Sequence, residues 1–235
     1  MVIDEGLEIA KGQINKLSHI NKFGYNTAVG ASYEVLTDLG THVLPTTAAA
    51  VSVVSSSAND AAAGTGARTL EVQGLDANYN LQTSTITLNG TAAVTTGSDT
   101  YLRVFRMRVL TAGTGETNAG AITASIGGSD IAQIKAEVGQ TLMGVYTVPA
   151  GHNVYLTKFQ ASLSKNQEAQ VQLRTKAADD GAWQVKGQFG TFANTVEYEY
   201  TVPLLITQKT DIQFRAKAGA TSEMGIVFDM LLEGH

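Results

Sequence analysis

Alternation of apolar and polar side chains with a period of two residues is the feature that most constrains this chain. It recurs through the second half, most clearly over residues 155–163, 169–174, 195–202, 212–217 and 226–232. Because successive side chains of a β-strand point to opposite faces of a sheet, this pattern predicts strands with one buried face. Turn signals such as Pro149-Ala150-Gly151 separate the strands. The spacing predicts an all-β fold, an antiparallel β-sandwich or jelly roll.

The first half shows the same period from about Ala31 onward. Residues 83–88 alternate ahead of Asn89-Gly90, and the renewed alternation after this pair predicts a tight β-hairpin. Residues 101–110 keep their apolar side chains on one face only if a β-bulge absorbs Phe105. The first half is therefore expected to be antiparallel β-structure as well.

We divide the chain into an extended N-terminal arm (residues 1–30), a first β-sandwich lobe (31–138) and a second, jelly-roll-like lobe (139–235). The boundary between the lobes follows a short predicted strand that ends before Gly139. Each side has enough residues for a sandwich of its own. Two lobes and one interleaved sandwich both fit the pattern, and we favour two lobes.

The N-terminal residues are the part of the chain with helical spacing. Apolar side chains recur there at intervals of four and three residues, as one face of a helix requires. Gly6 and Gly12 each weaken a helix by about 1 kcal/mol, however, and a helix this short is marginal without a partner surface. Of a helix and an irregular arm, we favour an arm that orders on a neighbouring subunit. Its candidate partner-binding residues are Ile3, Leu7, Ile14, Leu17, Phe23 and Tyr25.

Composition excludes several classes of function. The net charge of −5, from 16 Lys and Arg against 21 Asp and Glu, argues against a protein that neutralises nucleic-acid phosphates. Cysteine is absent, which excludes disulfides, thiolate catalysis and Cys-held metal sites. No stretch is apolar and long enough for a secretory signal or a membrane span. We therefore expect a chain made in the cytosol, with no nucleic-acid or membrane partner.

No constellation of residues indicates catalysis. The histidines lack the spacing of metal ligands, and no G-x-S-x-G motif supplies a nucleophile. The glycine-rich strings Gly64–Arg68 and Gly113–Gly120 lack the Lys-Ser/Thr of a phosphate-binding loop and do not lie between a strand and a helix. We expect loop glycines, no enzyme activity, no cofactor and no metal ion.

Charged side chains fall on single faces of two predicted strands. With a bulge at Phe105, Arg103, Arg106 and Arg108 share an outward face, and Glu197 and Glu199 form an outward acidic face elsewhere. Solvated surface and contact with another protein both explain such faces. Since Arg pairs bidentately with carboxylates, contact between subunits or with a partner is the sharper interpretation, and the three arginines are candidate partner-binding residues.

Several stretches of this sequence resemble one family. Residues 55–96, 101–124 and 139–159, with Lys22–Asn26 (KFGYN) ahead of them, are similar in order and spacing to virion structural proteins of tailed bacteriophages, especially marine and cyanobacterial ones. The resemblance covers roughly residues 50–232. It implies a non-enzymatic virion component, and it supplies no functional residues that can be matched position by position.

These observations together lead to an expectation about assembly. We expect a capsid decoration (cement) protein, a homotrimer that binds the outside of the major capsid protein shell in the virion. The alternative is a tail, baseplate or fibre protein that anchors a fibre or recognises a host glycan. Exposed aromatic residues would favour glycan binding, and the candidates are Tyr25, Tyr79 and Trp183, of which Trp183 fits a core position better.

Overall fold

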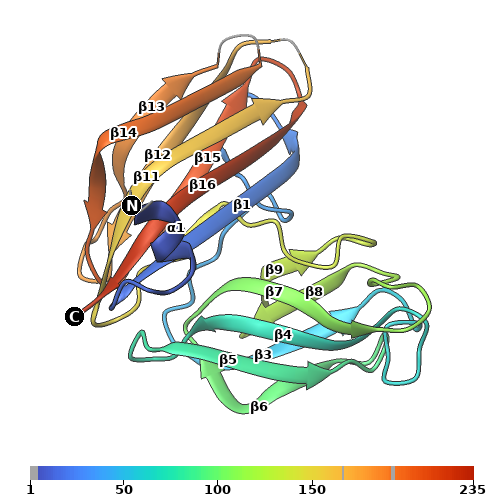
Figure 1. Ribbon diagram of the computed structural model, residues 1–235. Coiled ribbons are helices and arrows are strands. Elements are labelled where there is room, and N and C mark those ends of the chain that lie inside the picture. The colour runs from blue at the N-terminus through green and yellow to red at the C-terminus, as the bar shows by residue number, and fades with distance from the viewer. Residues whose placement is uncertain (1–4, 166, 192–193) are drawn as a thin grey trace. The chain divides into compact units, whose positions relative to one another are not determined.

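The structure is built almost entirely from β-strands (Figure 1). It is a computed structural model that describes residues 5–165, 167–191 and 194–235. The strand pairs for which registers are defined are antiparallel. The predicted all-β fold class is therefore confirmed.

The described chain divides into two compact units. Unit 1 holds the residues up to Phe23, Thr27–Glu34 and Gly144–His235, and unit 2 holds Gly24–Asn26 and Val35–Met143.

Unit 1 is a β-sandwich. In one sheet the strand order is β1-β16-β11-β14, and in the other it is β10-β15-β12-β13, with β2 also paired to β15. Phe159 of β11 and Phe214 of β15 bring the two sheets together, with ring centroids 5.2 Å apart, and Phe228 of β16 lies 4.8 Å from Phe214. The elements are α1 (Glu5–Ala10), β1 (Leu17–Val29), β2 (Glu34–Val35), β10 (Val145–Thr147), β11 (His152–Leu163), β12 (Ala169–Ala177), β13 (Gln184–Gly190), β14 (Thr195–Ile206), β15 (Thr210–Ala218) and β16 (Ser222–Gly234).

Unit 2 also places one sheet against another. The strand orders are β6-β3-β8-β9 and β5-β4-β7. Tyr101 at the end of β6 is fully buried, and its hydroxyl lies 2.6 Å from the hydroxyl of Ser84 on β5 and donates to the carbonyl of Val72 on β4. The strands are β3 (Ala49–Ser55), β4 (Ala67–Leu75), β5 (Leu81–Thr87), β6 (Val94–Tyr101), β7 (Arg103–Ala112), β8 (Ile122–Ile126) and β9 (Ser129–Ile134).

The β-bulge predicted at Phe105 is present. Gln73 on β4 pairs with Arg106 on β7, whereas the next residue, Gly74, pairs with Val104. The register therefore passes over Phe105. Val104 and Met107 consequently face the core together, as the sequence pattern requires.

The hairpin predicted at Asn89-Gly90 is wrong. Strand β5, before this pair, is bonded to β4, whereas β6, after it, is bonded to β3 in the other sheet. The N–H of Gly90 donates to the carbonyl of Asp60, and the carbonyl of Gly90 accepts from the N–H of Ser55. The turn therefore carries the chain from one sheet to the other, because local turn chemistry fixes the reversal but not the partner of the next strand.

The prediction of an extended arm over residues 1–30 is wrong for most of its length. The helix α1 ends at Ala10, and Leu17–Val29 forms β1, which is hydrogen-bonded to β16 in the sheet of unit 1. Without β1, strand β16 would end this sheet with an open edge, and covering such an edge satisfies its backbone groups.

The boundary between the units also lies later than expected. Residues 140 and 141 still pair with β7, since Gln140 bridges to Arg108 and the N–H of Thr141 donates to the carbonyl of Met107. Unit 2 consequently continues to Met143 rather than to residue 138.

Candidate functional site

The apolar residues predicted to bind a partner do not form one patch. Ile3 lies outside the described residues. Leu7 on α1 is 49% exposed, and Ile14, in the turn before β1, is half-buried. The remaining three, Leu17, Phe23 and Tyr25, are half-buried residues of β1. Docking of these residues on a neighbouring subunit stays a prediction, and for β1 it would have to occur from within the sheet of unit 1.

The predicted outward face of three arginines is wrong for Arg103. This residue is 7% exposed, and its Nη1 donates to the carbonyls of Pro45 and Leu102, each at 2.9 Å. Its burial depends on the segment around Pro45, which the spacing within β7 does not reveal.

Arg106 and Arg108 are half-buried and are occupied within unit 2. Arg106 donates to the side chain of Gln140 at 2.9 Å. Arg108 forms an ion pair with Glu71, with Nε 2.6 Å from one carboxylate oxygen and Nη2 3.3 Å from the other. The pKa of Glu71 is lowered mainly by its hydrogen bond from Arg108. Arg108 thus links β7 to β4, and Arg106 links β7 to Gln140, so both guanidinium groups already have partners within unit 2.

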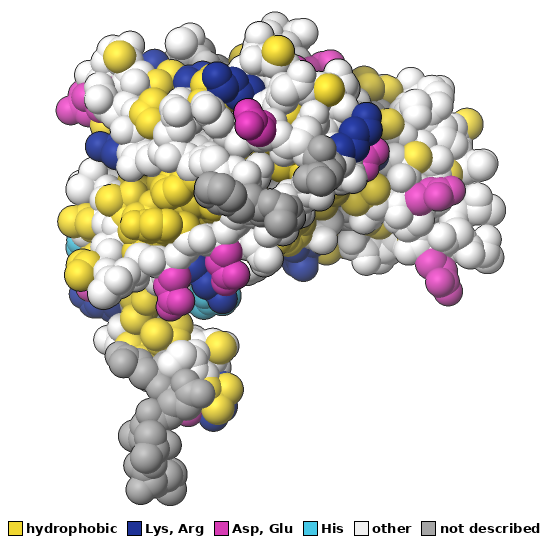
Figure 2. All heavy atoms as spheres, turned by 90° about the horizontal axis from the view of Figure 1, so that it is seen from above, with side chains coloured by type: hydrophobic (Ala, Val, Ile, Leu, Met, Phe, Trp, Pro, Cys, Tyr) yellow, Lys and Arg dark blue, Asp and Glu magenta, His cyan; other side chains and the backbone are white. Residues whose placement is uncertain are grey.

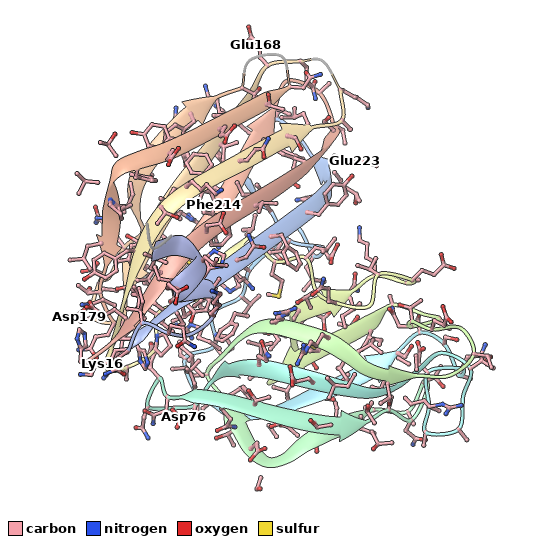
Figure 3. All side chains as sticks on the ribbon, viewed as in Figure 1. Lys16, Asp76, Glu168, Asp179, Phe214 and Glu223 are labelled. Carbon is pink, nitrogen blue, oxygen red and sulfur yellow. The ribbon has the colours of Figure 1, made fainter. Side chains whose placement is uncertain are left out.

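The structure instead gathers cations on the outer surface of β13, β12 and β15 in unit 1. The inner surface of β12 and β15 carries core residues such as Leu173 and Phe214. Strand β12 runs between Glu168 and Asp179, which lie at opposite ends of the unit (Figure 3). We call this surface the arginine–glutamine face. Its residues are Gln170, Gln172, Arg174, Gln188, Gln213, Arg215 and Lys217, with Tyr33 and Trp183 beside them.

Cross-strand register makes this face a hydrogen-bonded network. Gln172 pairs with Arg215 and Arg174 pairs with Gln213, so each arginine lies opposite an amide. The Nε of Arg215 donates to Gln172 at 2.9 Å, and the Nε of Arg174 donates to Gln213 at 2.6 Å. Gln172 in turn donates to Gln188 at 2.6 Å. The amides therefore fix both guanidinium groups through their Nε atoms.

Aromatic rings support the cations of this face. The guanidinium carbon of Arg174 lies 4.3 Å from the centroid of the Trp183 ring. On the other side, Tyr33 lies 4.6 Å from the guanidinium carbon of Arg215 and 5.1 Å from Nζ of Lys217. Trp183 is half-buried, so the expectation that it belongs to the core is wrong. Its position just before β13 places the ring on the outer surface.

Arg174 and Arg215 are not neutralised by an ion pair, since no carboxylate among the described residues lies within ion-pair distance of either. A carboxylate of the same face, that of Asp211, lies opposite Lys176 and accepts a hydrogen bond from the hydroxyl of Thr147. Burial first, and then the positive charge of Arg215, lower the pKa of Arg174 to about 10. At one end of the face, a hollow of about 480 Å³ lies beside Gln170, Lys217 and Glu168. The arrangement can bind anionic groups.

The outer surface of the other sheet of unit 1 carries carboxylates. Glu197 and Glu199 project from β14 and are exposed. In the register of β11 and β14, Glu199 lies opposite Lys158 and Glu197 lies opposite Gln160. We call the surface formed by Glu197 and Glu199 with their neighbours Val202 and Leu205 the carboxylate face. Figure 2 shows hydrophobic side chains gathered next to acidic ones on the face of the molecule in view.

Lys158 is engaged by another carboxylate of this sheet. Its Nζ lies 3.6 Å from Asp229, which also lies 2.8 Å from Nε2 of His19 and accepts from the amide of Asn21 at 2.8 Å. Burial opposes ionisation of Asp229, but these neighbours outweigh it and lower its pKa. This cluster ties β1 and β11 to β16 and leaves Glu197 and Glu199 as the open acids of β14.

The edge strand β14 is irregular where it is most apolar. Leu204 pairs with Leu156 and Glu199 pairs with Lys158, so four residues of β14 stand against a single residue of β11. Within this bulge Val202 is 80% exposed, and Leu205, just beyond it, is 51% exposed. Large apolar side chains of β14 are therefore exposed to solvent in and just beyond the bulge, in the part of the strand that follows Glu199.

The two glycine-rich strings have a structural role in unit 2. The N–H of Gly113 donates to the carbonyl of Gly66, and the N–H of Gly115 donates to that of Thr65, each at 2.8 Å. The two strings thus lie side by side and pack against Asp60. The expectation that they are structural loop glycines agrees with this placement.

Within residues 5–165, 167–191 and 194–235, no group of three His, Cys, Asp or Glu side chains is arranged to hold a metal ion. No helix in the same ranges has the length and apolar character needed to cross a membrane.

The class that the fold defines is an all-β protein with antiparallel β-sandwich structure. No protein-family model matches the chain, and no curated protein matches its sequence. Among solved structures, a chain of infectious bursal disease virus strain Gx is similar at 11% identity over 92% of this chain and 76% of that one, with a TM-score of 0.21. The VP2 subviral particle of infectious bursal disease virus matches at 9% identity over 99% of this chain and 83% of that one, with a TM-score of 0.19. Scores of this size establish neither a shared topology nor a shared function.

Proposed function

We propose that this chain is a structural protein of a bacteriophage virion, without enzyme activity, that decorates the capsid. In this role it binds the outside of the major capsid protein shell as a homotrimer and strengthens the contacts between capsomers. The resemblance of residues 50–232 to phage virion proteins supports the virion class. The capsid location and the trimer are our inference from the surfaces of unit 1.

The observation that carries the proposal is the exposed edge of unit 1. Strand β14 ends its sheet in the order β1-β16-β11-β14, and it presents Tyr198, Val202 and Leu205 at 42%, 80% and 51% exposure. An open strand edge with large apolar side chains is suited to contact with another protein, and it is a liability for a chain that stays alone. Protein interfaces are enriched in Tyr, Trp and Arg, which the outer surfaces of unit 1 also carry.

Image reconstruction of the purified virion tests the proposal. We expect density for this chain at many positions over the shell, each at a local threefold position between capsomers. Density confined to the tail or the portal vertex, with a bare shell, would overturn the decoration role.

A tail, baseplate or fibre protein is the second candidate. The position of Trp183 and Tyr33 on the outer surface of unit 1 favours it, since surface aromatic rings beside amides can bind sugar rings. Binding of the purified protein to host surface glycans, lost on Trp183→Ala, together with tail density in the reconstruction, would identify this role.

A further inference from the structure

We propose that copies of this chain associate head to tail, with Arg174 and Arg215 of one copy binding Glu197 and Glu199 of the next. This inference rests on the proposed function, because it specifies the contact through which the proposed oligomer forms. The arginine–glutamine face and the carboxylate face are the surfaces that meet.

The two arginines are fixed in position and have spare donors. Each gives its Nε to a glutamine of the neighbouring strand, and each lies over an aromatic ring. The terminal nitrogens of the guanidinium groups have no hydrogen-bond partner in the described part of the chain. Since a guanidinium held at Nε presents a planar pair of N–H donors, it can bind a carboxylate with little further loss of side-chain freedom.

The spacing of the cations matches that of the carboxylates. Arg174 and Arg215 are diagonal neighbours in the β12–β15 register, and such positions are about 7–8 Å apart. Glu197 and Glu199 lie two residues apart on one face of β14, which separates them by about 7 Å. Two carboxylates at this spacing can meet both guanidinium groups at once.

Both faces have apolar surface beside the charges. Trp183 and Val185, which is 50% exposed, flank Arg174, while the exposed Val202 and Leu205 follow Glu199 along β14, three and six residues beyond it. An exposed ion pair alone contributes about 1 kcal/mol or less, so the apolar neighbours are needed to exclude water from the pairs. Arg, Trp and Tyr are the residue types that dominate the binding energy of protein interfaces.

Other charged groups lie near both faces, and most of those opposed to the contact already have partners within unit 1. Lys158, opposite Glu199, lies beside Asp229, which holds it within its own sheet. On the cationic side, Lys176 and Lys217 add positive charge. The carboxylate of Asp211 lies opposite Lys176 but is buried and hydrogen-bonded to Thr147, and Glu168 lies at the end of the face beside the hollow. Arg174 and Arg215 repel each other, and a bound negative group would offset this repulsion.

The contact joins two different surfaces and is therefore heterologous. Such a contact repeats from copy to copy, and it closes into a ring when the rotation between copies permits. A homotrimer formed in this way needs no twofold axis, and each copy contributes one arginine–glutamine face and one carboxylate face.

Charge reversal in the full-length protein tests the contact. We measure the mass of three variants by sedimentation. One double variant carries Arg174→Glu and Arg215→Glu, a second carries Glu197→Arg and Glu199→Arg, and the third variant carries all four substitutions. Each double variant should associate roughly a hundredfold more weakly than the wild type, because like charges then face each other. The fourfold variant should associate again, because its two faces are exchanged in sign and remain complementary.

Controls separate loss of contact from loss of folding. A variant carrying both Lys11→Glu and Lys16→Glu makes the same change in net charge as the arginine double variant, away from both faces, and should leave the mass unchanged. Circular dichroism and melting temperature report whether each variant folds. A double variant that folds and associates like the wild type, a fourfold variant that stays monomeric, or a dissociated control would overturn the contact.

An acidic polysaccharide provides the competing outcome. If the wild type remains monomeric but binds polygalacturonate through Arg174 and Arg215, the face is a glycan site and the contact between copies is wrong. These results are independent of the location of the chain in the virion. Tail density would overturn the decoration role and leave the contact standing, whereas unchanged association of the double variants would do the reverse.

Discussion

The carboxylate of Asp60 accepts a hydrogen bond of 2.8 Å from the backbone N–H of Ala119, far along the chain from it. The same fully buried carboxylate accepts from the N–H groups of Ala67 and Gly120 and from the hydroxyl of Ser55. Four donors thus converge on one side chain. Asp60 therefore fixes the two glycine-rich strings of unit 2 relative to each other and to the end of β3.

Removal of this carboxylate should be among the most destabilising changes in unit 2. Asp60→Ala leaves several buried N–H groups without an acceptor, and each such group costs about 1–3 kcal/mol. We expect a loss of about 3 kcal/mol or more in the free energy of unfolding by urea. Asp130→Ala, at an exposed position in β9 of the same unit, is the matched control and should change stability by less than about 0.5 kcal/mol.

The same carboxylate makes the free energy of unfolding fall at acidic pH, which we call the acid limb of the stability curve. Burial acts to raise the pKa of Asp60, but the hydrogen bonds from Ser55 and the three backbone donors outweigh it, so the pKa is lowered. The stabilisation is therefore present above the unfolded-state pKa of about 3.9 and is lost as pH falls below it. Asp60→Asn should lack this part of the pH dependence between about pH 4 and pH 2. An unchanged acid limb would contradict this assignment.

Much of the fold could be predicted because it depends on neighbouring residues. The alternation of apolar and polar residues identified the strands, and the interruption of this alternation at Phe105 identified the bulge. The alternation of Gln170, Gln172 and Arg174 was equally visible. The contribution of these residues to the arginine–glutamine face could not be predicted. The face forms because β12 lies between β13 and β15, and the sequence does not specify which strands pair.

The errors arose where distant residues decide the outcome. Asn89-Gly90 produces a turn, but the pairing of β6 with β3 is decided by the sheet that the chain enters next. Arg103 has the spacing of an outward residue, yet the carbonyl of Pro45 covers it. The N-terminal segment has no strong strand pattern of its own, and the edge of β16 makes it a strand. In each case tertiary pairing overrode a local signal.

Asp38 should destabilise unit 2 at neutral pH. Burial raises its pKa to about 6, which the N–H of Leu142, donating to Oδ2 at 3.2 Å, only partly offsets. Its Oδ1 is buried without a hydrogen-bond partner. Since the folded-state pKa exceeds the unfolded value of about 3.9, stability falls as pH rises from about 4 to about 6 and stays lower above that.

Asp38→Asn tests this sign. The amide oxygen can still accept from Leu142, and no charge has to be buried. We expect the variant to be more stable than the wild type by about 1 kcal/mol at pH 8, allowing for partial solvent screening, and equally stable at pH 4. Urea unfolding at both pH values measures the difference, with Asp130→Asn as the exposed control. A variant that is less stable at pH 8 would show that the carboxylate is favourable there.

Arg103 and Arg108 should differ in their contribution to stability. Arg103→Ala removes a buried guanidinium and leaves the carbonyls of Pro45 and Leu102 without this donor, so we expect a loss of about 2–3 kcal/mol. Arg108→Ala removes a half-exposed ion pair with Glu71 and should cost about 1 kcal/mol or less. Urea unfolding of the two variants provides the comparison. Equal small losses, with binding to another protein abolished by Arg103→Ala, would restore the outward face that the structure contradicts.

The N-terminal segment should contribute to folding only from β1 onward. Leu7 on the six-residue helix α1 is 49% exposed, and most of residues 6–13 are exposed. We therefore expect deletion of residues 1–13 to change the melting temperature by less than about 2 °C. Deletion of residues 1–25 removes most of β1, exposes the edge of β16 and separates Asp229 from His19 and Asn21. That deletion should lower the melting temperature by several degrees and promote aggregation through the open edge.

Calorimetry of both truncations, with light scattering, distinguishes the two roles. If removal of residues 1–25 leaves melting unchanged and abolishes only incorporation into the particle, the segment acts as an arm on a neighbouring subunit and the β1–β16 pairing is not what stabilises unit 1.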